Sequence, residues 1–389
     1  MVKLAEQGST VLAAEAFRRA VGRVGRENVY CLVFEENRCI LDAMDVIPPE
    51  NVLTIDARTF GGAVRTGLAL LARFRRVRVD AAISFEFFAR SGAVLNYLSG
   101  AAFRVGLHAH AGGGPYTGDL QTHRLVSNPY LHASELFVTM VEALDQPAAR
   151  FPAFDQPRPQ VPEALPTWQP PASDLASVRR LLADSAGGPD LPPLVLLNAN
   201  CSDLLPIRRW DRSRYVQLAR LLLEARPEIL VAFTGAPAEA RAAEQLAHDV
   251  RAGVPARPRC VSLAGKTTMR QLLTLYSLSE VLVTNDSGPA HFASLTPIDV
   301  VTLFGPETPA VFAARTPRNH VLWAGIVCSP CVTAVNNRLS ACRDNVCMQR
   351  LTVDQVLSAV LSAYDARQPR RSRGPGDADG SPWSGPAVS

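Results

Sequence analysis

Residues 281–291 read VLVTNDSGPAH, in which a run of apolar residues passes directly into a polar turn. The apolar run is typical of a buried strand. Gly288 lets a ligand approach the backbone closely, and Pro289 suits the first turn of a helix that the preceding aspartate or Ser287 can cap. The free N–H groups of that turn, together with His291, predict an anion site. A capped helix without any ligand explains the same residues equally well.

Short apolar strands alternate with helical patterns through most of the chain. Such alternation predicts an α/β fold in which helices cover parallel sheets. Strands are predicted at Val29–Phe34, Val52–Ile55, Ala81–Phe85, Leu194–Leu197, Ile229–Thr234, Val281–Thr284 and Val300–Phe304. Helices are predicted at Thr10–Val24, Gly62–Phe74, Ser91–Leu98, Tyr215–Ala225, Ala238–Val250, Thr268–Ser279 and Pro289–Leu295.

A chain of 389 residues is longer than a single hydrophobic core usually grows, so two domains are expected. The stretch from Pro152 to Pro171 has seven prolines in 20 residues and cannot continue a helix or a central strand. Two α/β halves leave a cleft between them, where the carboxyl ends of their strands face each other. The predicted parts are an N-terminal α/β domain over 1–151, a proline-rich linker over 152–173, a C-terminal α/β domain over 174–365 and a disordered tail over 366–389.

Charge and hydropathy exclude several classes of protein. The net charge is +4, with 47% hydrophobic and 20% charged residues, and no basic stripe with interleaved aromatic residues indicates a nucleic-acid-binding protein. No run of about 18 apolar residues predicts a membrane span, and the N-terminus lacks the pattern of a secretory signal. We therefore expect a cytoplasmic protein, for which peripheral contact with the inner face of the cytoplasmic membrane stays open. Only two of the 40 basic residues are lysine, so phosphates must be met mainly by arginine and backbone N–H groups.

Residues 281–308, VLVTNDSGPAHFASLTPIDVVTLFGPET, resemble the donor-site signature of glycosyltransferase family 9, which includes the lipopolysaccharide heptosyltransferases. Three upstream elements resemble the family in the same order: RRW at 208–210, TGA at 234–236 with Glu239 close behind, and LAGKT at 263–267. Four ordered elements at the right separations are a far more specific signal than any one of them.

The resemblance implies the GT-B architecture, in which two Rossmann-like domains face each other, with the acceptor on the N-terminal one and the nucleotide sugar on the C-terminal one. It also implies that Arg208, in place of the family's lysine, lies near the phosphates and that Glu239 binds the ribose. The alternatives are a solvated pair of Arg208 with Asp211 or Asp203, and a helix-start role for Glu239. The donor site implied in this way comprises Asn200, Ser202, Arg208, Glu239, Asp286, Ser287, Gly288 and His291.

The implied reaction moves a sugar from a nucleotide-diphosphate donor to a lipopolysaccharide or another glycan or glycolipid acceptor. Heptose on ADP is the family's best-known donor. The reaction would be a direct displacement with inversion, and it would need no metal for catalysis. Two other functions stay open on the sequence: a GT-B-like nucleotide-sugar epimerase, and a non-catalytic protein that binds a nucleotide sugar.

The general base departs from the family pattern. In the family, an aspartate in a Gly-Asp turn after the first strand is the expected base, and here the corresponding turn reads EQGST over 6–10, so Ser9 stands in its place. Serine is not a useful base at neutral pH. Glu6, on the same turn, and Glu86, after a predicted strand, are the candidate substitutes, and a base elsewhere in the chain is the alternative. Only Met1–Leu4 precede the turn, so we expect the first strand to be truncated.

Four of the eight cysteines fall close together near the C-terminus. Their order, C-x2-C-x10-C-x4-C, is compatible with a small tetrahedral site for structural zinc, and family members have similar cysteines near this position. Two disulfides or four reduced thiols are the alternatives. The four residues are Cys328, Cys331, Cys342 and Cys347.

Overall fold

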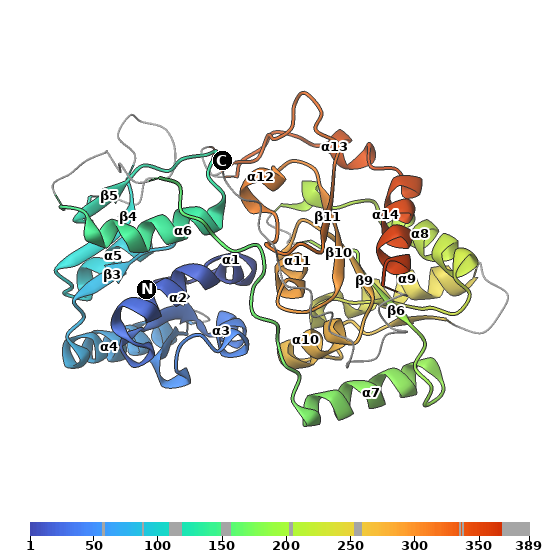
Figure 1. Ribbon diagram of the computed structural model, residues 1–389, viewed down its shortest axis with the longest axis horizontal. Coiled ribbons are helices and arrows are strands. Elements are labelled where there is room, and N and C mark those ends of the chain that lie inside the picture. Colours follow the sequence, from blue (N-terminus) through green and yellow to red (C-terminus); the bar gives the residue numbers. More distant parts are fainter. Residues whose placement is uncertain are drawn as a thin grey trace, which may run out of the picture.

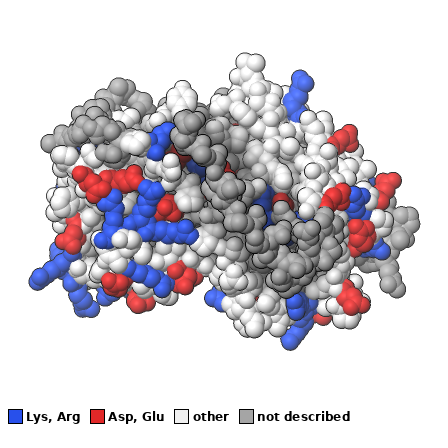
Figure 2. All heavy atoms as spheres, in the orientation of Figure 1, with Lys and Arg blue, Asp and Glu red and all other residues white. Residues whose placement is uncertain are grey.

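The computed structural model describes residues 1–56, 59–87, 89–108, 119–148, 157–201, 205–252, 259–333, 336 and 338–367. They form two α/β units that lie side by side, the N-terminal one on the left and the C-terminal one on the right of Figure 1. No helix among these residues is long and apolar enough to cross a membrane. On the face that Figure 2 shows, basic and acidic side chains are interspersed over the N-terminal unit and form no stripe of one sign.

The N-terminal unit contains parallel strands in two groups. Strands β1 (Cys31–Phe34) and β2 (Val52–Ile55) form the first group, and β3 (Ala81–Ile83), β4 (Phe103–Leu107) and β5 (His123–Leu125) form the second. The helices of this unit are α1 (Gln7–Leu12), α2 (Ala14–Val24), α3 (Arg38–Met44), α4 (Phe60–Val77), α5 (Arg90–Leu98) and α6 (Ala133–Glu142).

The first residues of the chain join these two groups of strands. Val2 pairs in parallel with Leu32 on one side and with Ser84 on the other. Val2 N donates a hydrogen bond to Ile83 O at 2.8 Å, and Phe85 N donates to Val2 O at 2.9 Å. Short as it is, the start of the chain therefore occupies a central place between the strands, because its backbone is hydrogen-bonded on both sides.

The C-terminal unit is one parallel sheet with the strand order β11-β10-β9-β6-β7-β8. One hydrophobic cluster packs α8, α9 and α14 against one face, and another packs α7, α10 and α11 against the other, so the sheet is doubly wound. Its strands are β6 (Leu194–Asn198), β7 (Leu230–Phe233), β8 (Cys260–Ser262), β9 (Val281–Asn285), β10 (Asp299–Phe304) and β11 (Asn319–Trp323). Its helices are α7 (Ala172–Ala186), α8 (Arg212–Ala225), α9 (Ala240–Ala252), α10 (Met269–Ser277), α11 (Gly288–Ala293), α12 (Pro309–Phe312), α13 (Val346–Gln349) and α14 (Val353–Asp365).

The seven predicted strands are all present, with ends that differ by at most two residues. Strands β4, β5, β8 and β11 were not predicted, because they are short or carry polar residues, as in the sequence HRL of β5. The helix predicted over Thr10–Val24 is split at Ala13 into α1 and α2. The helix predicted from Gly62 starts earlier, because the Thr59 side chain accepts a hydrogen bond from Gly62 N and caps α4.

Residues 157–171 connect the two units and contain neither helix nor strand. Helix α7 begins at Ala172, so the last two residues of the predicted linker are helical, while 152–156 lie outside the described residues. Arg367, at the start of the predicted disordered tail, donates hydrogen bonds to Glu280 and Asp299, both at 2.9 Å. The remainder of the tail lies outside the described residues, and the domain limits stay predictions.

Candidate active site

The candidate donor site lies at the carboxyl edge of the C-terminal sheet, where β6 and β9 are neighbours and the strand order reverses. Doubly wound sheets bind ligands in the crevice at such a point. Asn285, buried at the end of β9, connects the turn after β9 to the loop after β6. Its Oδ1 accepts a hydrogen bond from Trp210 N at 2.9 Å, and its Nδ2 donates to Asn200 O at 3.0 Å. The loops that carry the predicted donor residues are thereby fixed to each other.

Arg208 faces two carboxyl groups and not solvent. Its Nη1 lies 3.2 Å from Glu307 Oε2 and 3.8 Å from Asp286 Oδ2, and its side chain is 11% exposed. The alternative of a surface pair with Asp211 is wrong, because that carboxylate caps α8; Asp203 lies outside the described residues. Burial, reinforced by the neighbouring Glu307, raises the pKa of Asp286 well above its ordinary value. A carboxyl group whose pKa is raised in this way holds its proton more readily than an ordinary aspartate.

The start of α11 differs from the predicted capped helix. Ser287 occupies the cap position but makes no capping hydrogen bond, and its hydroxyl donates to Asn285 O at 3.1 Å. His291 is buried, and among the described residues no group hydrogen-bonds to its Nδ1. Burial, with the charge of nearby groups such as Arg208, lowers the pKa of His291 to about 3. The imidazole is therefore neutral at physiological pH and free to donate or accept a hydrogen bond at Nδ1.

Helix α1 of the N-terminal unit packs directly on α11. A Cβ atom added to Gly8 would lie 2.6 Å from Cδ2 of His291 and 3.3 Å from Cα of Gly288. No side chain larger than hydrogen fits between the two helices at this position, because real Cβ contacts are longer. The absence of a side chain at Gly8 thus brings the turn with Ser9 against the predicted donor residues.

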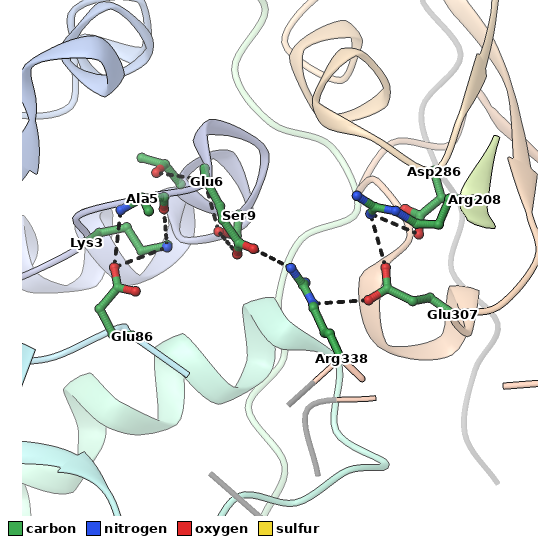
Figure 3. A network of polar contacts seen from close by, with 10 residues as sticks. Lys3, Ala5, Glu6, Ser9, Glu86, Arg208, Asp286, Glu307 and Arg338 are labelled. Atoms are coloured by element: carbon green, nitrogen blue, oxygen red, sulfur yellow. Dashed lines mark hydrogen bonds and ion pairs between the residues drawn. The ribbon is translucent and has the colours of Figure 1, made fainter. Parts of the chain in front are cut away.

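Glu6 projects from that turn toward the C-terminal unit. One of its carboxylate oxygens pairs with Arg338 Nη1, and the other accepts a hydrogen bond from Ser9 Oγ at 3.3 Å. Figure 3 shows Glu6 and Ser9 facing Arg338, which in turn reaches Glu307. Burial works to raise the pKa of the Glu6 carboxyl, but the charges of Arg338 and Lys3 outweigh it, so the pKa lies below its ordinary value. Glu6 is an ionised carboxylate at neutral pH.

Glu86 is placed differently from Glu6. It is 6% exposed, and its Oε1 accepts hydrogen bonds from Leu4 N at 2.6 Å and from Ala5 N and Lys3 Nζ, both at 3.4 Å. In Figure 3 it lies with Lys3 and Ala5, apart from Arg338 and the donor-side residues. These bonds hold residues 3–5 at the start of the chain in place.

The remaining predicted donor residues meet at the ends of β6 and β7. A Cβ atom at Gly235 would lie 2.9 Å from both Asn200 Nδ2 and Glu239 Oε2, so these two side chains converge on that glycine. Glu239 Oε2 accepts a hydrogen bond from Ala236 N at 2.7 Å. A carboxylate that stabilises the start of a helix, the alternative role of Glu239, would make such a bond. Ser202 lies outside the described residues.

The structure gives no support to the predicted zinc site. Cys328 and Cys342 are exposed, Cys331 is partly exposed and Cys347 is buried, and all four are free thiols. Within the described part of the chain, no group of three or more histidine, cysteine, aspartate or glutamate side chains is placed to hold a metal ion.

Glu307 and Arg338 were not among the site residues predicted from the sequence. Glu307 follows β10 at the same edge of the sheet as Asp286, so an acidic residue after a predicted strand was an available signal. Arg338 lies in an irregular segment after β11, where no periodicity points to a site. Its position beside Glu6 is a consequence of tertiary folding alone.

Two Rossmann-like units, with arginine, carboxyl and imidazole groups gathered where they meet, define a protein of the GT-B fold. The chain belongs to glycosyltransferase family 9 (heptosyltransferase), whose sequence pattern matches residues 68–340. The resemblance inferred from the motif at 281–308 is thereby confirmed.

Individual relatives agree with the family. The chain is 29% identical over 168 residues to lipooligosaccharide heptosyltransferase 2 of Haemophilus ducreyi, which covers 42% of this chain and 46% of that protein. It is 32% identical over 106 residues to lipopolysaccharide heptosyltransferase 2 of Escherichia coli, which covers 27% of this chain and 29% of that protein. These matches span less than half the length of the curated relatives.

Solved structures share the fold over nearly the whole chain. The E. coli ADP-heptose lipopolysaccharide heptosyltransferase II has a TM-score of 0.69 at 16% identity, with 94% of this chain and 98% of that chain covered. The E. coli heptosyltransferase WaaC with ADP has a TM-score of 0.60 at 17% identity, with 93% and 98% covered. At these identities the likeness shows a common fold.

Proposed function

We propose that this chain transfers a sugar, heptose in the first instance, from an ADP-linked donor to a hydroxyl of a lipopolysaccharide-type or related glycan acceptor, with inversion at the anomeric carbon. The observation that carries the proposal is a continuous set of ionic contacts, which runs from Asp286 and Arg208 through Glu307 and Arg338 of the C-terminal unit to Glu6 of the N-terminal unit. Membership of family 9 and the ADP complex of a solved relative support the choice of donor.

The charges around Asp286 suit a diphosphate. Arg208 and Arg338 bring two guanidinium groups to the carboxyl groups of Asp286 and Glu307, and the raised pKa of Asp286 favours its neutral form beside them. Helix α11 has only six residues, so the arginines must supply most of the neutralisation. Arg208 can offer two N–H groups to phosphate oxygens, and neutral His291 can add a hydrogen bond without competing for protons.

Glu6 is the carboxylate best placed to act as general base. In the proposed reaction its carboxylate accepts the proton of the acceptor hydroxyl while that oxygen attacks the anomeric carbon of the donor. The bond between the anomeric carbon and the diphosphate oxygen breaks in the same displacement, and ADP leaves with the electron pair. Ser9, hydrogen-bonded to Glu6, orients the carboxylate and is not itself the base.

The reaction is tested by incubating the protein with ADP-heptose, with and without a lipopolysaccharide fragment as acceptor. ADP release only with acceptor, and a product whose anomeric configuration is opposite to that of the donor by NMR, is the expected result. Release without acceptor would instead indicate hydrolysis or epimerisation. Binding without turnover would show a non-catalytic protein, and either outcome overturns the proposal.

The donor site is tested separately by ADP affinity. Arg208→Gln and His291→Ala should each weaken ADP binding by roughly tenfold or more, because hydrogen bonds to charged groups contribute about 1.5–3 kcal/mol. His248→Ala is the matched control, since this histidine on α9 is 67% exposed and lies beside Asp249 on the same helix. Unchanged ADP affinity in both site variants, with the fold intact by circular dichroism, would show that the donor binds elsewhere.

A further inference from the structure

Arg338 links the two units at the point where the proposed displacement takes place. Its Nη1 pairs with Glu6, while its Nε lies 3.1 Å from Glu307 Oε1. The guanidinium carbon lies 5.3 Å from the centre of the Phe312 ring, which covers one face of the group. The side chain is 19% exposed, so this cation contacts two carboxylates in a mostly enclosed place.

We propose that Arg338 is a positioning residue that exchanges partners during the reaction. It holds Glu6 while the donor is absent, and it turns Nη1 to the donor's diphosphate when the donor binds, so that Glu6 is released to accept the acceptor's proton. The inference rests on the proposed function and adds an order of events to the reaction: the donor binds first, and only then is Glu6 available as the base.

The geometry supports a change at one end of the guanidinium only. The Nε contact with Glu307 and the Phe312 ring belong to the C-terminal unit, whereas Glu6 is contributed by the N-terminal unit. Arg338 can therefore keep its own-unit contacts while Nη1 changes partner. A planar guanidinium presents several N–H groups in fixed directions, which makes such a simultaneous contact with carboxylate and phosphate feasible.

The electrostatics give the exchange a direction. Glu6 is 38% exposed, so its pair with Arg338 is partly screened by solvent and contributes little. A diphosphate carries more negative charge than one carboxylate and competes well for the same cation. A carboxylate held by an arginine is also a weaker base than the same carboxylate without it, because the ion pair stabilises the ionised form. Release of Glu6 thus increases its basicity at the step that needs it.

A double-mutant cycle read by ADP affinity tests the exchange. The four proteins are the unaltered chain, Glu6→Gln, Arg338→Gln and the double variant, with ADP binding measured by calorimetry at constant salt. Glu6→Gln should tighten ADP binding about fivefold, because Arg338 no longer has to leave a partner. Arg338→Gln should weaken it, and in the Arg338→Gln background Glu6→Gln should change nothing. Arg338→Lys, which keeps the charge without the fork, should recover part of the lost affinity.

The outcomes separate this inference from the proposed function. If the unaltered chain does not bind ADP, the proposed donor is wrong. If it binds ADP and Glu6→Gln tightens binding equally with and without Arg338, the carboxylate acts by simple repulsion and the exchange is refuted. Equal ADP affinity in all four proteins would refute it as well. A gain that depends on Arg338, in variants with unchanged thermal unfolding, is the result that the exchange requires.

Discussion

Replacing each candidate base, Glu6 or Glu86, by glutamine should have opposite effects on the reaction rate and on the stability of the protein. Glu6→Gln removes a carboxylate that is 38% exposed and faces the donor-side residues. A positioned general base contributes roughly 100- to 10,000-fold to a rate, so kcat should fall by that factor. The free energy of unfolding should change by at most about 1 kcal/mol, since solvent screens an ion pair at this exposure. ADP affinity should rise, because Arg338 no longer has to leave Glu6 to bind the diphosphate.

Glu86→Gln should show the reverse pattern. This carboxylate is 6% exposed and is ion-paired at 3.4 Å with Lys3, which is 1% exposed. Removing one partner of a buried pair leaves an uncompensated charge and costs about 3–5 kcal/mol. Glutamine keeps an oxygen that can accept from Leu4 N, so the lower end of that range is expected. The rate per folded molecule should change little.

The assay measures single-turnover rates with ADP-heptose, together with urea unfolding of the same preparations. If Glu6→Gln retained a rate within tenfold of that of the unaltered chain, Glu6 would not be the general base. If Glu86→Gln abolished turnover while its unfolding midpoint stayed unchanged, the structural role of Glu86 would be refuted. In the latter case the start of the chain would not depend on Glu86, and Glu86 would become the candidate for the general base.

Three further predictions follow from packing, burial and thiol exposure. Gly8→Ala should wedge α1 from α11 and destabilise the protein by about 1–3 kcal/mol, whereas Gly22→Ala, in open space on α2, should stabilise it by about 0.5–1 kcal/mol, both measured by urea unfolding. Burial lowers the pKa of His132 to about 4 in the folded protein, below the unfolded-state value near 6.5. The free energy of unfolding is therefore highest above pH 6.5 and falls by about 2 kcal/mol between pH 6.5 and 5, because the unfolded chain takes up the proton first. His132→Gln should flatten that part of the curve of stability against pH. The exposed thiols of Cys328 and Cys342 should react with a chromogenic disulfide reagent at the same rate before and after treatment with a chelator, and protection that the chelator lifts would show a bound metal.

Local patterns in the sequence determined most of the secondary structure of this protein. Strand β9 and the turn after it could be predicted because the apolar run, the glycine and the proline are contiguous, and their physical preferences act within a few residues. The order of four family-like elements also identified the fold, since each element keeps its place along the chain. Short polar strands such as β5 and β11 could not be predicted, because pairing with neighbours, and not their own composition, makes them strands.

Tertiary structure alone decided which of these residues work together. Glu6 and Arg338 are 332 positions apart, and only the packing of the two units places them in contact. On the sequence alone, Glu6 and Glu86 were equal candidates for the base, but Glu86 is buried against Lys3 and accepts a hydrogen bond from Leu4 N at the start of the chain. The raised pKa of Asp286 likewise depends on burial and on Glu307, which follows the neighbouring strand β10. Desolvation and through-space charge have no signature along a chain, so these properties belong to the fold.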